Sequence, residues 1–171
     1  LVAWYKFDDP NSLKDETGNY PLTNPGTDVS FSTTKKVIGK SSYFPGSGNN
    51  YLSITNSFNP YTIWNGNGIT FSWWANLESM DTYGRIFEIG SNSTNRITVY
   101  VYSGTMTITV KYGSTAELGN VQLFPNNNGI GVWKHYVWTI STSGIWSSYL
   151  NGVNQNISKT LNIPNMSYTL F

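Results

Sequence analysis

The chain has 171 residues, enough to bury a sizeable core, and its 11% charged residues leave a formal net charge of only +1. It therefore lacks the electrostatic footprint of a protein that binds nucleic acid or an acidic membrane, and we expect uncharged partners. It contains no cysteine, which excludes disulfides and thiolate zinc sites, and no apolar run approaches the roughly 20 residues that span a bilayer.

The N-terminal segment predicts a first strand. Leu1–Phe7 is apolar and aromatic, and it ends at Asp8-Asp9-Pro10, where the proline cannot pair in a ladder and the carboxylates favour a turn. Residues 11–29 are too rich in Asn, Ser, Gly and Pro for regular structure, apart from a short strand near Tyr20–Leu22. Further strands are predicted, in chain order, at Ser41–Phe44, Tyr51–Ile54, Ile69–Leu77, Arg85–Gly90, Arg96–Tyr102 and Thr105–Tyr112.

Alternation along the middle strands assigns their two faces. In the first of these strands Thr70, Ser72, Trp74 and Asn76 share one side, opposite Ile69, Phe71, Trp73, Ala75 and Leu77. In the later strands Ile97, Val99 and Val101 are expected in the core, opposite Thr98, Tyr100, Tyr102, Thr107 and Thr109. Ser103-Gly104 marks a tight turn, and the spread of short strands with almost no helical period predicts an all-β fold.

Residues 133–153 predict the central hairpin of a sandwich. Tyr136, Trp138 and Ile140 fall on one face of its first arm, and Trp146-Ser147-Ser148-Tyr149-Leu150 forms the second arm. Asn151-Gly152 then supplies the pair of positive-φ residues that a type I′ turn requires, so the chain doubles back at Val153.

Several motifs, in this order, resemble laminin-G-like domains of the concanavalin A-like lectin/glucanase superfamily. They are Leu1–Asp8, Gly39–Ile54, Ile69–Ala75 with Trp74, Ile86–Gly90, Trp133-Lys134-His135 and Tyr149–Val153. The resemblance implies a jelly roll of two antiparallel sheets over residues 1–171 as a single domain, with binding of glycans or protein surfaces as the usual role. Many members of this family bind calcium, so the resemblance also allows for a calcium site.

The C-terminal end departs from that family pattern. Members of the family normally continue beyond Asn162–Phe171 with two closing strands, the last of which carries an acidic residue. We therefore expect the chain to be a piece of a larger protein. We also expect a second polypeptide fragment or a neighbouring molecule to supply the closing strands, or the open edge to be covered in some other way, because a sheet without these strands exposes unpaired backbone groups.

No constellation of residues predicts catalysis. Related glucanases in the superfamily place carboxylates at i, i+2 and i+5 of one strand, and no segment here has that spacing. Asp8-Asp9 and Asp15-Glu16 are adjacent pairs that we interpret as solvated turn carboxylates. His135 is the only histidine, so a triad would have to include it together with a nucleophile and an acid.

A calcium site is the metal centre that the sequence permits. Calcium prefers carboxylate and carbonyl oxygens from turns, and Asp8 and Asp9 follow the first predicted strand. The resemblance adds loop carbonyls near Gly46–Asn50 and an acidic residue of the last strand, which this chain does not contain. An ordinary Asp-Pro turn is the alternative.

Sugar binding needs flat aromatic faces beside hydrogen-bonding groups. The residues that could assemble such a site on an open sheet face are Trp74, Glu88, Tyr100, Tyr102 and Tyr149. Ordinary cross-strand packing of these aromatic side chains is the alternative.

The sequence thus favours a non-catalytic, lectin-like recognition module from a secreted, cell-surface or virion-surface protein, with a glycan or glycosylated surface as partner. One alternative is part of a polysaccharide-active enzyme whose catalytic residues lie elsewhere. Another is a structural jelly roll without a ligand. The fold alone cannot separate these roles.

Overall fold

A computed structural model describes residues 1–8, 13–26, 28–46, 50–54, 56, 58–79, 83–113, 119–124 and 130–165. The chain divides into two compact units, one that includes Leu1–Phe58 and one within Asn59–Tyr168. Each unit is described by itself, and the interpretation of residues 1–171 as one domain stays a prediction. Among the described residues, no helix is long and apolar enough to cross a membrane.

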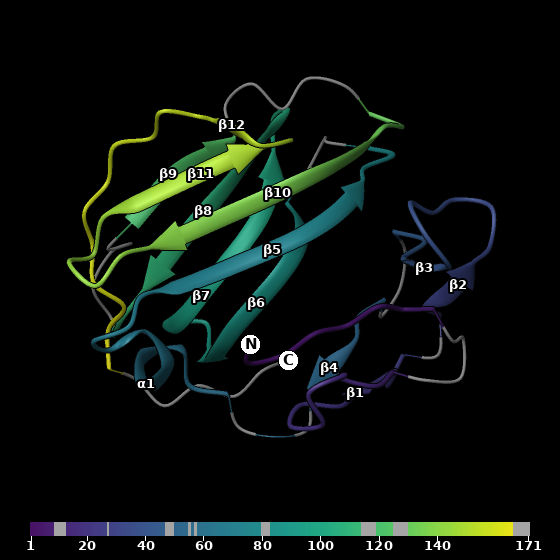
Figure 1. Cartoon of the computed structure of the whole chain (residues 1–171), viewed down its shortest axis with the longest axis horizontal. Helices are drawn as coiled ribbons and strands as arrows, with labels where there is room; N and C mark the ends of the chain where they lie inside the picture. Colours follow the sequence, from purple (N-terminus) through teal and green to yellow (C-terminus); the bar gives the residue numbers. More distant parts are fainter. Residues whose placement is uncertain are drawn as a thin grey trace. The chain divides into compact units, whose positions relative to one another are not determined.

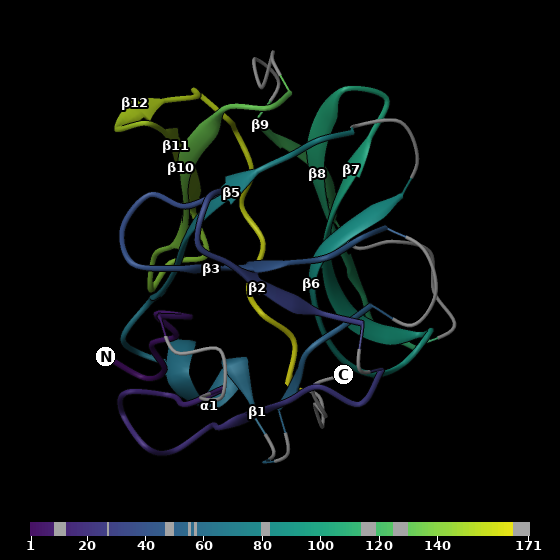
Figure 2. The same ribbon diagram turned by 90° about the vertical axis from the view of Figure 1, so that its right-hand side faces the viewer.

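The second unit is a sandwich of two antiparallel four-stranded sheets, as predicted (Figures 1 and 2). One sheet has the order β12-β11-β10-β5 and the other has the order β6-β7-β8-β9. The strands of the first sheet are β5 (Ile69–Asn76), β10 (Trp133–Ile140), β11 (Trp146–Leu150) and β12 (Val153–Asn154). Those of the second sheet are β6 (Gly84–Asn92), β7 (Asn95–Tyr102), β8 (Thr105–Lys111) and β9 (Gly119–Phe124).

Aromatic rings from both sheets form the core of this unit. Trp73 of β5 meets Phe87 of β6 edge to face at 5.5 Å and Phe124 of β9 at 6.0 Å. Trp138 stacks on Phe71 at 4.9 Å, and the expected core positions Tyr136, Ile140, Ile97, Val99 and Val101 are all buried. The alternation in the sequence therefore assigned these core faces correctly.

The central hairpin forms as predicted. β10 pairs with β11 in the register Trp138↔Ser148, and β11 pairs in turn with β12. Asn151 and Gly152 have φ values of 50° and 82°, which are the positive angles of the predicted type I′ turn. β10 also pairs with β5 along its whole length, so β10 lies between β11 and β5 in the sheet.

Two elements of this unit were not predicted from the sequence. Strand β9 is one, and helix α1 (Pro60–Trp64) is the other. Asn59 caps the helix through its side-chain oxygen, which accepts from the Tyr61 amide, and Pro60 occupies the first turn, where its missing N–H costs nothing. Trp64 at its end is buried and donates its indole N–H to Ser141 O at 2.8 Å.

The first unit contains two small two-stranded sheets. β1 (Leu22–Thr23) pairs with β4 (Ser53–Ile54), and β2 (Ser30–Ser32) pairs with β3 (Ser41–Tyr43). The strands expected on either side of residues 45–48 therefore exist, but they pair with other partners and not with each other.

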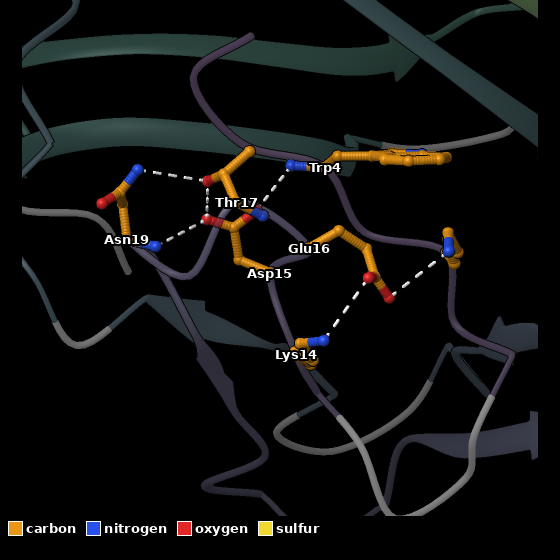
Figure 3. A network of polar contacts seen from close by, with 7 residues as sticks. Trp4, Lys14, Asp15, Glu16, Thr17 and Asn19 are labelled. Atoms are coloured by element: carbon orange, nitrogen blue, oxygen red, sulfur yellow. Dashed lines mark hydrogen bonds and ion pairs between the residues drawn. The ribbon is translucent and has the colours of Figure 1, made fainter.

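The prediction of a first strand at Leu1–Phe7 is wrong. The backbone of this segment is bonded to the loop around Asp15 and not to a ladder (Figure 3). Trp4 donates its amide to Asp15 Oδ1 at 2.7 Å, Trp4 O accepts from the Glu16 amide, and Val2 O accepts from Thr17 Oγ1. Phe7 has a positive φ of 58°, which also breaks an extended run.

Candidate functional site

The side of the β12-β11-β10-β5 sheet that is turned away from the core is the first candidate surface, and this sheet lies in front in Figure 1. We name it the Trp74 face. Its side chains are Thr70, Ser72, Trp74, Asn76, Trp133, His135, Val137, Thr139, Ser147, Tyr149 and Asn154. None of these is a carboxylate, a lysine or an arginine, so the surface is polar without a fixed charge.

Trp74 is the most prominent side chain of this face. Its indole is 52% exposed, although a tryptophan on a sheet is ordinarily mostly covered. The ring stacks on His135, with ring centroids 5.0 Å apart and planes inclined by 23°. One side of the indole is thus supported by protein while much of the ring remains open to a ligand.

His135 is held from two directions. Its Nε2 lies 2.8 Å from Ser72 Oγ, and its backbone N–H donates to Asn151 Oδ1 at 2.9 Å. A serine beside a histidine at this distance suits a nucleophile and its base. In the part of the chain that the structure describes, however, no carboxylate bonds His135, so the third member of a triad is not formed.

A shallow depression of about 590 Å³ lies at the other end of the Trp74 face. Its floor includes Thr70, Thr139 and Ser147, which are cross-strand neighbours on β5, β10 and β11. The remaining lining residues come from the ends of these strands and their loops: Asn67, Gly68, Ile69, Ile140, Ser141, Thr142, Ser143 and Ile145. Six of its eleven lining residues carry a hydroxyl, the others include three isoleucines, and none is charged.

The outward side of the other sheet carries a cluster of tyrosines at one end, which we name the tyrosine face, whereas Thr98, Thr107 and Thr109 on the same side are buried. Tyr83 stacks on Tyr100 at 5.9 Å and lies 4.7 Å from Tyr102, whose side chain is 46% exposed. Beside them, Glu88 Oε2 accepts from Thr98 Oγ1 at 2.8 Å and pairs with Arg85 and Arg96 at 3.3 and 3.4 Å. The carboxylate of Glu88 is therefore engaged by protein groups.

The five predicted sugar-binding residues divide between these two surfaces. Trp74 and Tyr149 belong to the Trp74 face, whereas Glu88, Tyr100 and Tyr102 belong to the tyrosine face. Because the two sheets pack core to core, these surfaces point in opposite directions, and one small ligand cannot touch both. Sequence reasoning did not identify Tyr83 or the depression near Thr139 as parts of a site.

The expected calcium site has one described carboxylate. Asp8 Oδ1 accepts from the Lys40 amide at 3.3 Å and lies against Gly39, where a Cβ would come within 1.8 Å of that oxygen. Asp9 and residues 47–49 lie outside the described residues. Within the described ranges, no group of three or more His, Cys, Asp or Glu side chains lies together, and one carboxylate falls short of the six to eight oxygens calcium prefers. The calcium site stays a prediction.

Asp15 corrects one sequence interpretation, because it is not a solvated turn carboxylate. It is 0% exposed and accepts hydrogen bonds from Thr17 Oγ1 and from the amides of Trp4, Thr17, Asn19 and Tyr20 (Figure 3). Burial acts to raise the pKa of this carboxyl, but the donated bonds outweigh it and lower the pKa to about 2. Its oxygens are already occupied by donors, so Asp15 is a structural anion.

Comparison with solved structures finds sandwich domains of the same fold. The chain matches domain 4 of AbnA, a GH43 extracellular arabinanase from Geobacillus stearothermophilus, solved with arabinotriose, at 21% identity and a TM-score of 0.63. This match covers 99% of the chain and 82% of that domain. A second match has 17% identity and a TM-score of 0.70. It is a structure of botulinum neurotoxin type C, whose cell entry is described as dependent on interaction with two ganglioside molecules.

The extent of these matches differs. The chain covers only 40% of the neurotoxin structure and 41% of the binding domain of botulinum neurotoxin DC, which was solved with rat synaptotagmin II. The latter match has 16% identity, a TM-score of 0.69 and 99% coverage of the chain. At these identities the likeness shows the fold alone. Among curated proteins, no match to the chain is found.

A laminin G family model, described as Concanavalin A-like lectin/glucanases superfamily, matches residues 45–169. This range includes the whole sandwich, the Trp74–His135 pair and the central hairpin with its Asn151-Gly152 turn. The chain therefore belongs to the laminin G type of the concanavalin A-like lectin/glucanases superfamily.

Proposed function

We propose that the chain is a non-catalytic, lectin-like recognition module that binds uncharged carbohydrate on the Trp74 face. The observation that carries this proposal is the 52% exposure of Trp74, whose indole stacks on His135 and lies between Ser72 and Asn76 on its strand. We place the module in a secreted, cell-surface or virion-surface protein, where glycans are the accessible partners.

The chemistry of the face suits a sugar. A pyranose has an apolar C–H surface that packs on an aromatic ring, and its rim of hydroxyls both donates and accepts hydrogen bonds. Trp74 and Tyr149 provide rings, while Ser72, Thr139 and Asn154 provide neutral donors and acceptors. The absence of charged side chains among the residues of this face disfavours phosphate or carboxylate ligands, which need cationic partners.

Domain 4 of the arabinanase, solved with arabinotriose, and the neurotoxin structure reported with gangliosides support a carbohydrate ligand by analogy of fold. The binding domain of botulinum neurotoxin DC was solved in complex with synaptotagmin II, so the same fold also binds protein. The chemistry of the Trp74 face, and not the fold, is therefore the reason for choosing carbohydrate.

A printed array of neutral and acidic glycans, probed with the purified chain, tests the proposal. Two variants sharpen it: Trp74→Ala removes the exposed indole of one face, and Tyr102→Ala removes a ring of similar exposure, 46%, from the other face. We expect the chain to bind neutral glycans, Trp74→Ala to abolish this binding, and Tyr102→Ala to preserve it.

Each other outcome rejects part of the proposal. If the array shows no binding, the lectin function is wrong and a structural jelly roll is favoured. If Tyr102→Ala abolishes binding and Trp74→Ala does not, the tyrosine face is the site. If bound oligosaccharides are shortened during incubation, as chromatography of the products would show, the module is part of a polysaccharide-active enzyme.

A further inference from the structure

We infer that the Trp74 face holds an extended, neutral oligosaccharide chain that runs from Trp74 along β5 and β10 to the depression at Thr139. The unit recognised is then an internal stretch of a polysaccharide and not a single terminal sugar. This inference rests on the proposed function and adds the shape of the ligand to it.

The register of the three strands sets out the track. Its successive cross-strand rows are Trp74–His135, then Ser72–Val137–Tyr149, then Thr70–Thr139–Ser147. Residues on the same face of a strand are about 7 Å apart, so the first and last rows lie about 14 Å apart. A single pyranose reaches one row or two, and only a chain of several sugars contacts all of them.

The depression gives the track a built end. It continues beyond the last row to Asn67, Ser141 and Ser143, with Ile145, a 53% exposed side chain, also among its lining residues. It is an open depression of about 590 Å³, so a sugar bound in it would keep one side in solvent. The lining mixes six hydroxyl-bearing residues with three isoleucines, which suits a sugar that has both hydroxyls and apolar C–H faces.

Backbone contacts hold this end in place before a ligand arrives. Ser141 N donates to Ile145 O at 2.9 Å, Ile145 N donates to Ser141 Oγ at 3.0 Å, and Ser141 O accepts from the Gly144 amide and the Trp64 indole. Gly68 has a φ of 70° and lies so near β10 that a Cβ would sit 3.0 Å from Ile140 O. A site that is already ordered loses less entropy on binding.

The occupant follows from the character of the surface. An acidic polysaccharide or a phosphorylated ligand would find no lysine or arginine among the side chains of the Trp74 face. An apolar peptide would leave the hydroxyls of Thr70, Thr139 and Ser147 without partners, which carries a desolvation cost. A neutral glycan chain can pack its C–H faces on Trp74 at one end and hydrogen-bond the hydroxyls of the depression at the other.

The test is a length series of neutral gluco-, xylo- and arabino-oligosaccharides, from the monosaccharide to the hexasaccharide, titrated into the chain by calorimetry. In the series that binds, we expect affinity to rise at least tenfold from the monosaccharide to the tetrasaccharide and then to level off. The double variant Thr139→Val/Ser147→Ala removes two hydroxyls at the depression and leaves Trp74 in place. We expect it to weaken tetrasaccharide binding at least fivefold and to weaken monosaccharide binding by a smaller factor, because Trp74 is retained.

Melting curves of the double variant confirm that it is folded, and Trp74→Ala serves as the variant that weakens every member of the series. If the monosaccharide binds as tightly as the hexasaccharide, or if the double variant binds the whole series like the wild type, the extended track is wrong while the lectin function stands. If no member of any series binds and the array is also negative, the proposed function itself fails.

Discussion

The indole of Trp74 and the imidazole of His135 stack across the β5–β10 pair, with ring centroids 5.0 Å apart. The two residues are direct partners in the register, so the ladder of backbone hydrogen bonds holds both rings. Ser72 Oγ lies 2.8 Å from His135 Nε2 and so fixes the orientation of the imidazole. The exposed indole is thus presented in one orientation, which reduces the ordering that a ligand would have to impose.

Removing the support of the indole should weaken binding without unfolding the sheet. An aromatic pair contributes about 0.5–1.5 kcal/mol, so His135→Ala is expected to lower affinity for the best-binding tetrasaccharide roughly two- to tenfold. His135→Phe restores the stack without the bond to Ser72 and should recover most of that loss. Calorimetry measures both variants, and an affinity of His135→Ala equal to that of the wild type would show that the stack does not position Trp74.

Ser148 joins the two sheets, and its removal should cost stability. It is fully buried on β11, and its Oγ donates at 2.5 Å to Leu123 O on the facing sheet. Leu123 is the extra residue of a bulge, since Gln122 pairs with Thr107 and Phe124 with Met106. Ser148→Ala is expected to lower the free energy of unfolding by about 1–3 kcal/mol, because the Leu123 carbonyl loses its donor in the interior.

The neighbouring serine provides the control for that prediction. Ser147 points to the Trp74 face, and Ser147→Ala should change the free energy of unfolding by less than about 0.5 kcal/mol. Urea denaturation followed by tryptophan fluorescence measures both variants. Equal effects of the two substitutions would mean that the bond to Leu123 contributes nothing to stability.

The same bulge explains why the sequence did not reveal β9. Leu123 and Phe124 are consecutive and both buried, so the alternation that identifies a strand is lost there. The central hairpin, by contrast, could be predicted in detail, because its alternation and its Asn151-Gly152 turn are local signals. Leu1–Phe7 has the composition of a strand, but the buried carboxylate of Asp15 draws its backbone into another set of hydrogen bonds.

The candidate site was only half predictable for a related reason. Alternation shows which residues share a face of their own strand, but the sheet that a strand joins depends on pairing between distant segments. β5 pairs with β10, far along the chain, while β6, the next strand after β5, joins the other sheet. Trp74 and Glu88 therefore lie on opposite sides of the sandwich, although they belong to consecutive strands.

Two glycines of β6 should respond differently to alanine. A Cβ at Gly90 would lie 2.5 Å from Arg96 Cβ and 2.6 Å from Asn95 O, so Gly90→Ala would push β6 away from β7. We expect a loss of about 1–3 kcal/mol in the free energy of unfolding, as for other overpacked sites. At Gly84 a Cβ would meet nothing within 4 Å, and Gly84→Ala should be neutral or stabilise by up to about 1 kcal/mol.

Thermal melting of both variants at neutral pH tests this pair. Because the two glycines share one strand, the difference between them isolates the close approach of β7 at Gly90. A Gly90→Ala variant as stable as Gly84→Ala would show that β6 and β7 can separate there at no cost.

Asp15 should make the stability of the first unit depend on acid pH. Its pKa is lowered from 3.8 to about 2, so the charged carboxylate stabilises the folded state at pH values above its ordinary pKa. This contribution, about 2 kcal/mol for a shift of this size, is lost as the pH falls from about 4 through the folded-state pKa near 2. Asp15→Asn should lower the free energy of unfolding by a similar amount at neutral pH. The side-chain NH₂ group of asparagine would face N–H groups that now donate to the Asp15 carboxylate.

Urea titrations of the wild type and the variants between pH 7 and pH 2, followed by far-UV circular dichroism, measure this dependence. Glu16→Gln is the matched control: the carboxylate of Glu16 is solvent-accessible and pairs with Lys6 and Lys14 at 3.6 and 3.5 Å, so its removal should change stability by less than about 1 kcal/mol. Asp15→Asn should also flatten the acid limb of the wild-type profile. If the variant keeps the wild-type pH profile, the acid sensitivity arises elsewhere and Asp15 is not its source.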